Sequence, residues 1–265
     1  MLEIKHVSKT FNVNTINEKK ALKDLNLKLE DGDFVTVIGG NGAGKSTMLN
    51  MIAGVYPIDS GRIILDGKDI SLEPEYKRAE WIGRVFQDPM MGTAADMEIQ
   101  ENLAFARRRG KARGLAWGVT KEEKGELREN LKRLGLGLED RMSSKVGLLS
   151  GGQRQALTLL MATMQRPKLL LLDEHTAALD PKTAKAVLDL TQKIVEEEHL
   201  TAIAVTHNMK DAIQMGNRLI MMHDGHIIYD VKGEEKKNLK VEDLLKKFEQ
   251  ASGEEFANDR MMLSK

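Results

Sequence analysis

The chain contains no cysteine, so it can form neither disulfide bonds nor thiolate metal sites, and this fits a reducing compartment. No apolar run approaches the roughly 20 residues that a membrane-spanning helix needs. The first six residues lack the apolar core of a signal peptide. Neither charge dominates, because 40 basic residues balance 40 acidic ones, and a nucleic-acid-binding surface is not expected. We therefore expect a cytoplasmic protein that reaches a membrane only through a partner.

What the chain does contain is a glycine-rich loop that fits the phosphate-binding pattern Gly-x-x-x-x-Gly-Lys-Ser. An apolar, β-branched run at 34–38 predicts a buried strand before the loop, and residues 47–53 have helical spacing that ends at Gly54. The loop residues are Gly39, Gly40, Asn41, Gly42, Ala43, Gly44, Lys45 and Ser46. A glycine turn before an ordinary helix is the alternative interpretation.

The chemistry of this loop explains its residue types. Glycines let backbone N–H groups surround a phosphate chain, and the following helix start adds partial positive charge. Lys45 is expected to neutralise the β- and γ-phosphates, and Ser46 to give its hydroxyl to Mg²⁺. At 265 residues the chain can hold one large domain or two small lobes, and it shows neither an internal repeat nor a second phosphate loop.

Alternation and helical spacing predict the other elements. Half-exposed antiparallel strands are expected at 2–7 and 25–29, with Phe11 between them either stacking on an adenine ring or packing in the core. Further strands are expected at 62–65, 82–86, 168–172, 202–206, 219–222 and 226–229. Helices are expected within 97–138 and at 149–165, 181–198 and 241–248, with a loose tail after Ser252.

A basic segment, residues 107–117, interrupts the helical region. It contains four arginines and Lys111, and it ends at Trp117. Such a run is usually a solvated face; the alternative is a contact with anionic headgroups or with a partner protein, because a tryptophan adds an interfacial ring.

Polar residues follow the predicted buried strands where a ligand is expected in an open α/β sheet. Asp173 comes after four leucines and is the expected second Mg²⁺ partner. Glu174 is placed to take a proton from an attacking water, although it could instead cap a helix. His207 ends the strand at 202–206, which favours a catalytic role over a structural one.

With these residues in this order, the sequence resembles the ATP-binding cassette (ABC) ATPases over nearly its whole length. The signature Leu149-Ser150-Gly151-Gly152-Gln153 stands some twenty residues before the Asp173-Glu174 pair. The resemblance implies an α/β fold: a phosphate-loop NTPase core with an antiparallel β subdomain and an inserted α-helical subdomain. It implies one domain at 1–250, with the core and β subdomain at about 1–92 and 165–250, the helical subdomain at about 93–164, and a flexible tail at 251–265.

The resemblance also implies the roles of residues. Gln87 matches the glutamine that reaches Mg²⁺ and the lytic water, and His207 the histidine on the γ-phosphate. The catalytic set is then Lys45, Gln87, Glu174 and His207, and the metal set is Ser46, Gln87 and Asp173. The residues implied to bind nucleotide are Phe11 as the adenine-stacking aromatic, Gly39 to Gly44, Lys45, Ser46, Thr47, the signature residues Ser150, Gly151, Gly152 and Gln153, and the interface aspartate Asp180.

The family works as a head-to-tail dimer that holds two ATP between one copy's phosphate loop and the other's signature. A homodimer with two MgATP and a separate integral membrane permease is therefore implied, with an extracytoplasmic substrate-binding protein acting through the permease. The chain looks like the ATPase subunit of a bacterial importer, peripheral on the inner face of the membrane. The alternatives are the ATPase subunit of an exporter and a soluble cassette protein acting on ribosomes or DNA.

Two features bear on the cargo and the permease. Residues 87–97 and 173–178 resemble an importer subgroup associated with amino-acid uptake, including aromatic amino acids. Met90, Met91 and Met97 either form an adaptable surface for a permease helix or fill the core.

Overall fold

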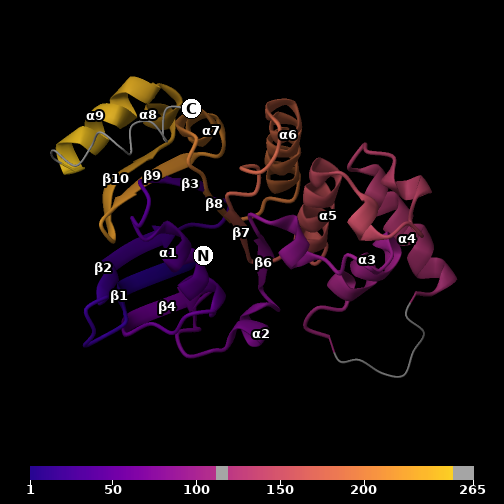
Figure 1. The fold of residues 1–265 in the computed structure, drawn as a ribbon, viewed down its shortest axis with the longest axis horizontal. Coiled ribbons are helices and arrows are strands. Elements are labelled where there is room, and N and C mark those ends of the chain that lie inside the picture. The colour runs from indigo at the N-terminus through magenta and orange to yellow at the C-terminus, as the bar shows by residue number, and fades with distance from the viewer. Residues whose placement is uncertain (112–118, 253–265) are drawn as a thin grey trace. The chain divides into compact units, whose positions relative to one another are not determined.

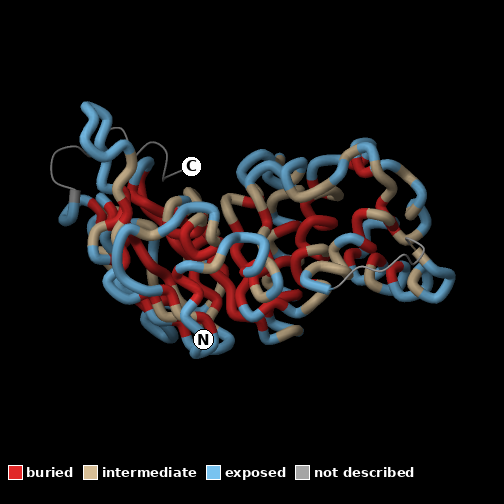
Figure 2. Tube along the Cα trace, turned by 90° about the horizontal axis from the view of Figure 1, so that it is seen from below, coloured by how far each residue is buried: buried red, intermediate tan, exposed pale blue. Residues whose placement is uncertain are grey.

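The computed structural model describes residues 1–111 and 119–252, and the chain divides into two units. Unit 1 comprises Met1–Arg78 with His199–Lys265, and unit 2 comprises Ala79–Glu198 (Figure 1). Buried residues run through the interior of each unit, as Figure 2 shows in red. No helix in the described part of the chain is long and apolar enough to span a bilayer.

An antiparallel sheet forms one layer of unit 1, and its strand order is β2-β1-β4-β5. Leu2 of β1 pairs with Leu29 on one side and with Leu65 on the other, so apolar side chains of three strands share one face. The predicted strands at 2–7, 25–29 and 62–65 are confirmed. The strands are β1 (Leu2–Phe11), β2 (Lys19–Leu29), β4 (Ser60–Leu65) and β5 (Lys68–Asp69).

The other strands of unit 1 form the platform for the glycine-rich loop. Strand β3 pairs in parallel with β8 and with β9, and β10 returns antiparallel to β9. Every residue of β3 and β8 is buried, as their continuous apolar sequences predict. The strands are β3 (Phe34–Ile38), β8 (Ala202–Val205), β9 (Arg218–His223) and β10 (His226–Lys232).

Helices cover these strands. In Figure 1 the yellow helix α9 lies along β9 and β10, and Leu244 and Phe248 of α9 pack in a cluster with Leu219 and Met221 of β9. Three short helices, α2, α7 and α8, were not predicted because each has six residues or fewer and therefore shows little periodicity. The helices are α1 (Lys45–Ala53), α2 (Glu75–Arg78), α7 (Met209–Gln214), α8 (Glu234–Lys237) and α9 (Val241–Ser252).

Unit 2 combines two parallel strands with a set of helices. Strands β6 (Ile82–Val85) and β7 (Leu169–Asp173) pair in parallel. The helical stretch predicted within 97–138 contains two helices, α3 and α4, whose leucines share a buried cluster with α5. The helices are α3 (Ile99–Arg107), α4 (Lys121–Lys132), α5 (Gly151–Thr163) and α6 (Pro181–Glu197), with short 3-10 turns η1 (Pro89–Gly92), η2 (Leu138–Asp140) and η3 (Val146–Leu148).

Candidate functional site

The glycine-rich loop joins β3 to α1 in unit 1. Its backbone has positive φ at Gly39 (152°), Gly42 (77°) and Gly44 (102°). A Cβ on Gly39 would lie 2.2 Å from the carbonyl oxygen of Met222, and one on Gly44 would lie 2.7 Å from that of Ala21. Larger residues therefore cannot take this path, and the backbone is free to turn its N–H groups toward a bound anion.

Lys45 is the first residue of α1, and its side chain turns back over the loop. Its Nζ donates to the carbonyl oxygens of Gly39 at 2.6 Å and Gly40 at 3.0 Å, and the residue is only 5% exposed. Its ammonium group therefore lies within the loop where a phosphate chain is expected. Ser46 is exposed and Thr47 is half-buried at the helix start.

The start of α1 suits an anion. Its N-cap is Gly44, and within the described residues no side chain caps the first turn. Backbone N–H groups at a helix start that lacks a side-chain cap, together with the helix dipole, favour negative charge. The geometry of unit 1 thus matches the predicted phosphate loop, while the roles of its individual residues remain predictions.

His207 follows β8 at the same sheet edge as the loop. Val37 pairs with Val205, and the N–H of Thr206 donates to the carbonyl oxygen of Val37 at 3.1 Å. Because parallel strands end at one edge, the half-buried His207 follows β8 there, beside Gly39. The local chain is held in place by Asn208, whose side chain caps α7.

Phe11 is the last residue of β1 and is half-buried. Its ring packs edge-on against Tyr56 with ring centroids 5.2 Å apart, and the Nζ of Lys9 lies 5.6 Å from its centroid. The adenine-stacking role of Phe11 remains a prediction, because these contacts are compatible with either predicted role.

In unit 2, the carboxyl ends of β6 and β7 bring three predicted residues to one edge. Val85 pairs with Leu172, so Gln87 and the pair Asp173 and Glu174 both follow at that edge. Their carboxylate and amide oxygens are donor types that Mg²⁺ accepts. The donor set therefore fits Mg²⁺.

Glu174 leaves β7 in a left-handed turn, with φ of 46°. Its carbonyl oxygen accepts from the N–H of Ala177 at 3.0 Å, which closes the turn. The next helix, α6, takes its cap from Asp180. The alternative that Glu174 caps this helix is therefore wrong.

The signature segment starts α5 in unit 2. Ser150 is the N-cap: its hydroxyl accepts from the N–H of Gln153 at 3.3 Å, and the Gln153 side chain accepts from the Ser150 N–H at 3.2 Å. A Cβ on Gly152 would lie 2.2 Å from Cγ2 of Thr183, and one on Gly151 would lie 3.1 Å from Leu179. The signature glycines were predicted to let the backbone approach a phosphate closely. The packing of Thr183 within unit 2 also favours a glycine at position 152.

Asp180 caps the helix that packs against this segment. Its Oδ1 accepts from the N–H of Thr183 at 3.1 Å. Hydrogen bonds from the side chain and the backbone of Thr183 hold the pKa of Asp180 below its ordinary value. Thr183 therefore contacts both the predicted interface aspartate and Gly152 of the signature.

His175 is a residue of the site region that sequence reasoning did not single out. It follows Glu174, is 4% exposed, and its Nε2 lies 3.1 Å from the Thr191 hydroxyl of α6. Burial lowers its pKa to about 4. The buried imidazole is therefore neutral at neutral pH. No local signal marks it, because its neighbours Glu174 and Thr176 are also polar.

The first part of the basic segment is bound within unit 2. Arg107 and Arg108 each pair with a glutamate of α4. Arg109 donates to the carbonyl oxygen of Ala162 at 3.2 Å, and burial lowers the pKa of its guanidinium. These three arginines are therefore tied to neighbouring helices rather than forming a solvated face. Residues 112–117 lie outside the described residues.

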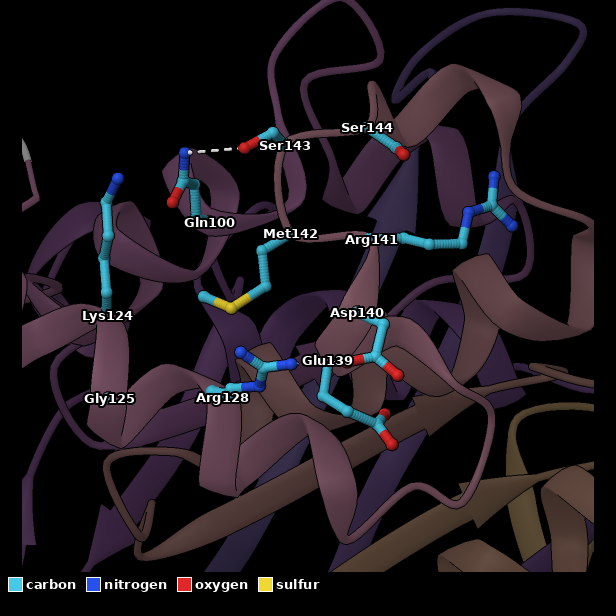
Figure 3. A pocket seen from close by; sticks show the side chains of 10 residues that line it. All are labelled: Gln100, Lys124, Gly125, Arg128, Glu139, Asp140, Arg141, Met142, Ser143 and Ser144. Carbon is cyan, nitrogen blue, oxygen red and sulfur yellow. Dashed lines mark hydrogen bonds and ion pairs between the residues drawn. The ribbon is translucent and has the colours of Figure 1, made fainter.

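Unit 2 also contains a cleft of about 570 Å³, and Figure 3 shows the side chains that line it. Arg128 forms an ion pair with Asp140, and Gln100 donates to Ser143 at 3.5 Å. None of the predicted site residues lines it. The lining residues are Gln100, Lys124, Gly125, Arg128, Glu139, Asp140, Arg141, Met142, Ser143 and Ser144.

The predicted residues thus form two sets, one in each unit. Unit 1 contains the phosphate loop, Thr47, Phe11 and His207, and unit 2 contains Gln87, the signature, Asp173, Glu174 and Asp180. A strand, glycine loop and helix with a buried lysine define a phosphate-loop nucleotide-binding protein.

Comparison with known proteins identifies the family. The family described as ABC transporter matches residues 22–177. The chain belongs to this family and is an ATP-binding cassette ATPase of a transport system.

Three relatives illustrate the match. The tyrosine transport ATP-binding protein of Clostridioides difficile (strain R20291) is 48% identical over 252 residues, 95% of this chain and 100% of that protein. A phosphonates import ATP-binding protein of Lactobacillus acidophilus (strain ATCC 700396 / NCK56 / N2 / NCFM) is 35% identical, over 89% of this chain and 90% of the relative. A dimeric ATP-binding cassette solved in a post-hydrolysis state with ADP and Pi superposes with a TM-score of 0.74 at 32% identity, covering 88% of this chain and 98% of that one. The predicted fold class is confirmed.

Proposed function

We propose that two copies of this chain close head to tail around two MgATP and that ATP hydrolysis drives a separate membrane permease. The observation that carries the proposal is that one chain holds both halves of the sandwich. Its phosphate loop precedes an α1 start capped only by glycine, and its signature glycines lie at the start of α5. A two-fold dimer of such a chain contains two complete sites. The dimeric cassette among the similar structures supports this arrangement.

Within each site, the proposed roles follow from where the residues lie. Lys45 and the loop amides bind the phosphates, and Glu174 accepts a proton from the attacking water. His207 contacts the γ-phosphate from the end of β8. Bound Mg²⁺ would be held by Ser46, Asp173 and Gln87, and it supplies positive charge that offsets the phosphates. Phe11 stacks on the adenine, and the signature residues and Asp180 act across the dimer interface.

The division into subdomains is also proposed. The buried cluster shared by α3, α4 and α5 gives residues 93–164 a core of their own, which supports a helical subdomain inserted between a core at 1–92 and 165–250. The predicted flexible tail, 251–265, falls mostly outside the described residues.

We propose that the permease docks on η1 of unit 2. Met90 and Met91 in this turn are 40% and 70% exposed, which argues against core filling for these two residues. Met97 is half-buried. Flexible methionine side chains suit a surface that must adapt to a partner helix.

The proposed cargo is an amino acid, and an aromatic one in particular, taken up with the help of an extracytoplasmic substrate-binding protein. The name of the 48% identical relative, a tyrosine transport ATP-binding protein, supports this. Import is favoured over export because the phosphonates relative is named as an import ATP-binding protein. The proposed location is the inner face of the cell membrane.

Glu174→Gln tests the catalytic proposal. The variant should bind MgATP, lose turnover and accumulate as an ATP-bound dimer on size exclusion, because the amide cannot accept the proton. The matched control Glu122→Gln, on the exposed surface of α4, should hydrolyse ATP like the parent. Turnover by Glu174→Gln near the parent rate would show that the base is assigned wrongly.

A transport assay tests the cargo. Cells lacking this chain should lose uptake of labelled tyrosine, and the parent chain should restore uptake whereas Glu174→Gln should not. Unchanged tyrosine uptake in the deleted cells would contradict an aromatic amino-acid cargo while leaving the ATPase assignment intact.

A further inference from the structure

Arg84 is the last residue but one of β6 and lies on the same face of the strands as Asp173. Arg84 pairs with Leu171 across the parallel strands. Side chains two residues apart share a face of a strand, so Arg84 and Phe86 lie on the same side of the sheet as Leu171 and Asp173. The guanidinium can thus extend along β6 toward the carboxyl edge, where Asp173 ends β7.

The contacts bear out this direction. Nη2 of Arg84 lies 3.8 Å from Oδ2 of Asp173, and the two side chains are only 14% and 16% exposed. The guanidinium carbon lies 4.5 Å from the ring centroid of Phe86, which holds the planar group over an aromatic face. A charge pair this far removed from water interacts more strongly than one on the open surface.

We propose that Arg84 is a positioning residue that forms an ion pair with Asp173 before the metal arrives and competes with Mg²⁺ for this carboxylate. The inference rests on the proposed metal role of Asp173. Arg84 places a positive charge beside this carboxylate from within unit 2.

The same charge weakens metal binding. A guanidinium beside Asp173 reduces the negative potential that attracts a divalent cation, and it must yield part of its interaction when Mg²⁺ binds. Arg84 thereby holds the Asp173 carboxylate in place while lowering the affinity of the site for the metal. A lower metal affinity helps the nucleotide to leave after hydrolysis.

The test measures binding rather than turnover, in the Glu174→Gln background. The dissociation constant for ATP is determined in EDTA and again in saturating Mg²⁺. The EDTA value divided by the Mg²⁺ value reports how strongly the metal supports nucleotide binding. Arg84→Met keeps a long apolar side chain without the charge and should raise this ratio by roughly three- to tenfold. Arg84→Lys keeps the charge and should leave the ratio within about twofold of the parent value.

Two further variants separate this inference from the proposed function. Asp173→Asn should lower the ratio; if it does not, the metal role of Asp173 is wrong. If Asp173→Asn lowers the ratio but Arg84→Met leaves it unchanged or lowers it, only the competition is refuted. In the Asp173→Asn background the effect of Arg84→Met should fall to less than about half, and an undiminished effect would also refute competition at this carboxylate. Should Arg84→Met fail to fold, Arg84→Gln carries the same comparison.

Discussion

Replacing Gly152 by alanine tests why the signature requires glycine at this position. The added Cβ would lie 2.2 Å from Cγ2 of Thr183, whereas carbon atoms in contact are normally about 3.5–4.0 Å apart. Rotation of Thr183 about χ1 could relieve the overlap. However, a rotated Thr183 side chain would disturb its contact with Asp180, which lowers the pKa of that carboxyl. Either response strains the contact between α5 and α6.

The expected cost follows from the overlap at Thr183. Overpacking a close contact costs typically about 1–3 kcal/mol. The better helix propensity of alanine returns up to about 1 kcal/mol. Gly152→Ala should therefore lower the free energy of unfolding by about 1–2 kcal/mol, or the melting temperature by roughly 2–8 °C for a chain of this size.

Thr183→Ser provides the matched rescue, since serine retains the hydroxyl and lacks Cγ2. The double variant should recover most of the stability lost by Gly152→Ala, as measured by chemical denaturation and calorimetry. A double variant no more stable than Gly152→Ala alone would refute the packing explanation. If stability returns while ATP hydrolysis does not, the glycine has the additional role that was predicted for it, close approach to a phosphate.

Two other predictions concern buried titratable groups. Burial lowers the pKa of His175 from 6.5 to about 4; the unfolded chain therefore binds a proton more readily, and the free energy of unfolding should fall by roughly 3 kcal/mol as the pH drops from 6.5 to 4. His175→Gln should flatten this dependence between pH 7.5 and 5 in denaturant titrations, and the exposed-site control His226→Gln should not. Lys236 donates to the carbonyl oxygens of Ile213 and Gly216, each at 3.1 Å, near the end of α7. Lys236→Met should destabilise the protein by about 1–3 kcal/mol, while Lys237→Met on the exposed side of α8 should change stability by less than about 0.5 kcal/mol; equal effects would contradict a role for Lys236 in holding α7.

Much of the local structure could be predicted because its signals are local. The strand at 34–38 has the same bounds in the structure as in the prediction, since a short apolar run followed by glycines leaves little choice. The helix after it ends at Gly54, which takes the left-handed conformation expected of a glycine cap. Helix α7 was missed because only Asn208, its capping residue, marked a six-residue helix.

Other features could not be predicted because they depend on partners far away in the chain. Lys236 and the carbonyl groups that bind it are about twenty residues apart. The buried His175 contacts Thr191, which lies 16 residues later in the chain, in α6. Arg84 and Asp173 come together only through the register of β6 on β7.

The sequence by itself determined the chemistry of this protein: the phosphate-binding loop, the order of the carboxylates and the signature, and the ABC resemblance that the family match bears out. These depend on residue types at short spacings, which set the local backbone. Only the tertiary structure decided that Gly152 must be small for Thr183 and that Lys45 lies over its own loop. It also decided that Arg84 reaches the carboxylate expected to face the metal. Such contacts arise when distant segments pack together, and no local spacing specifies that packing.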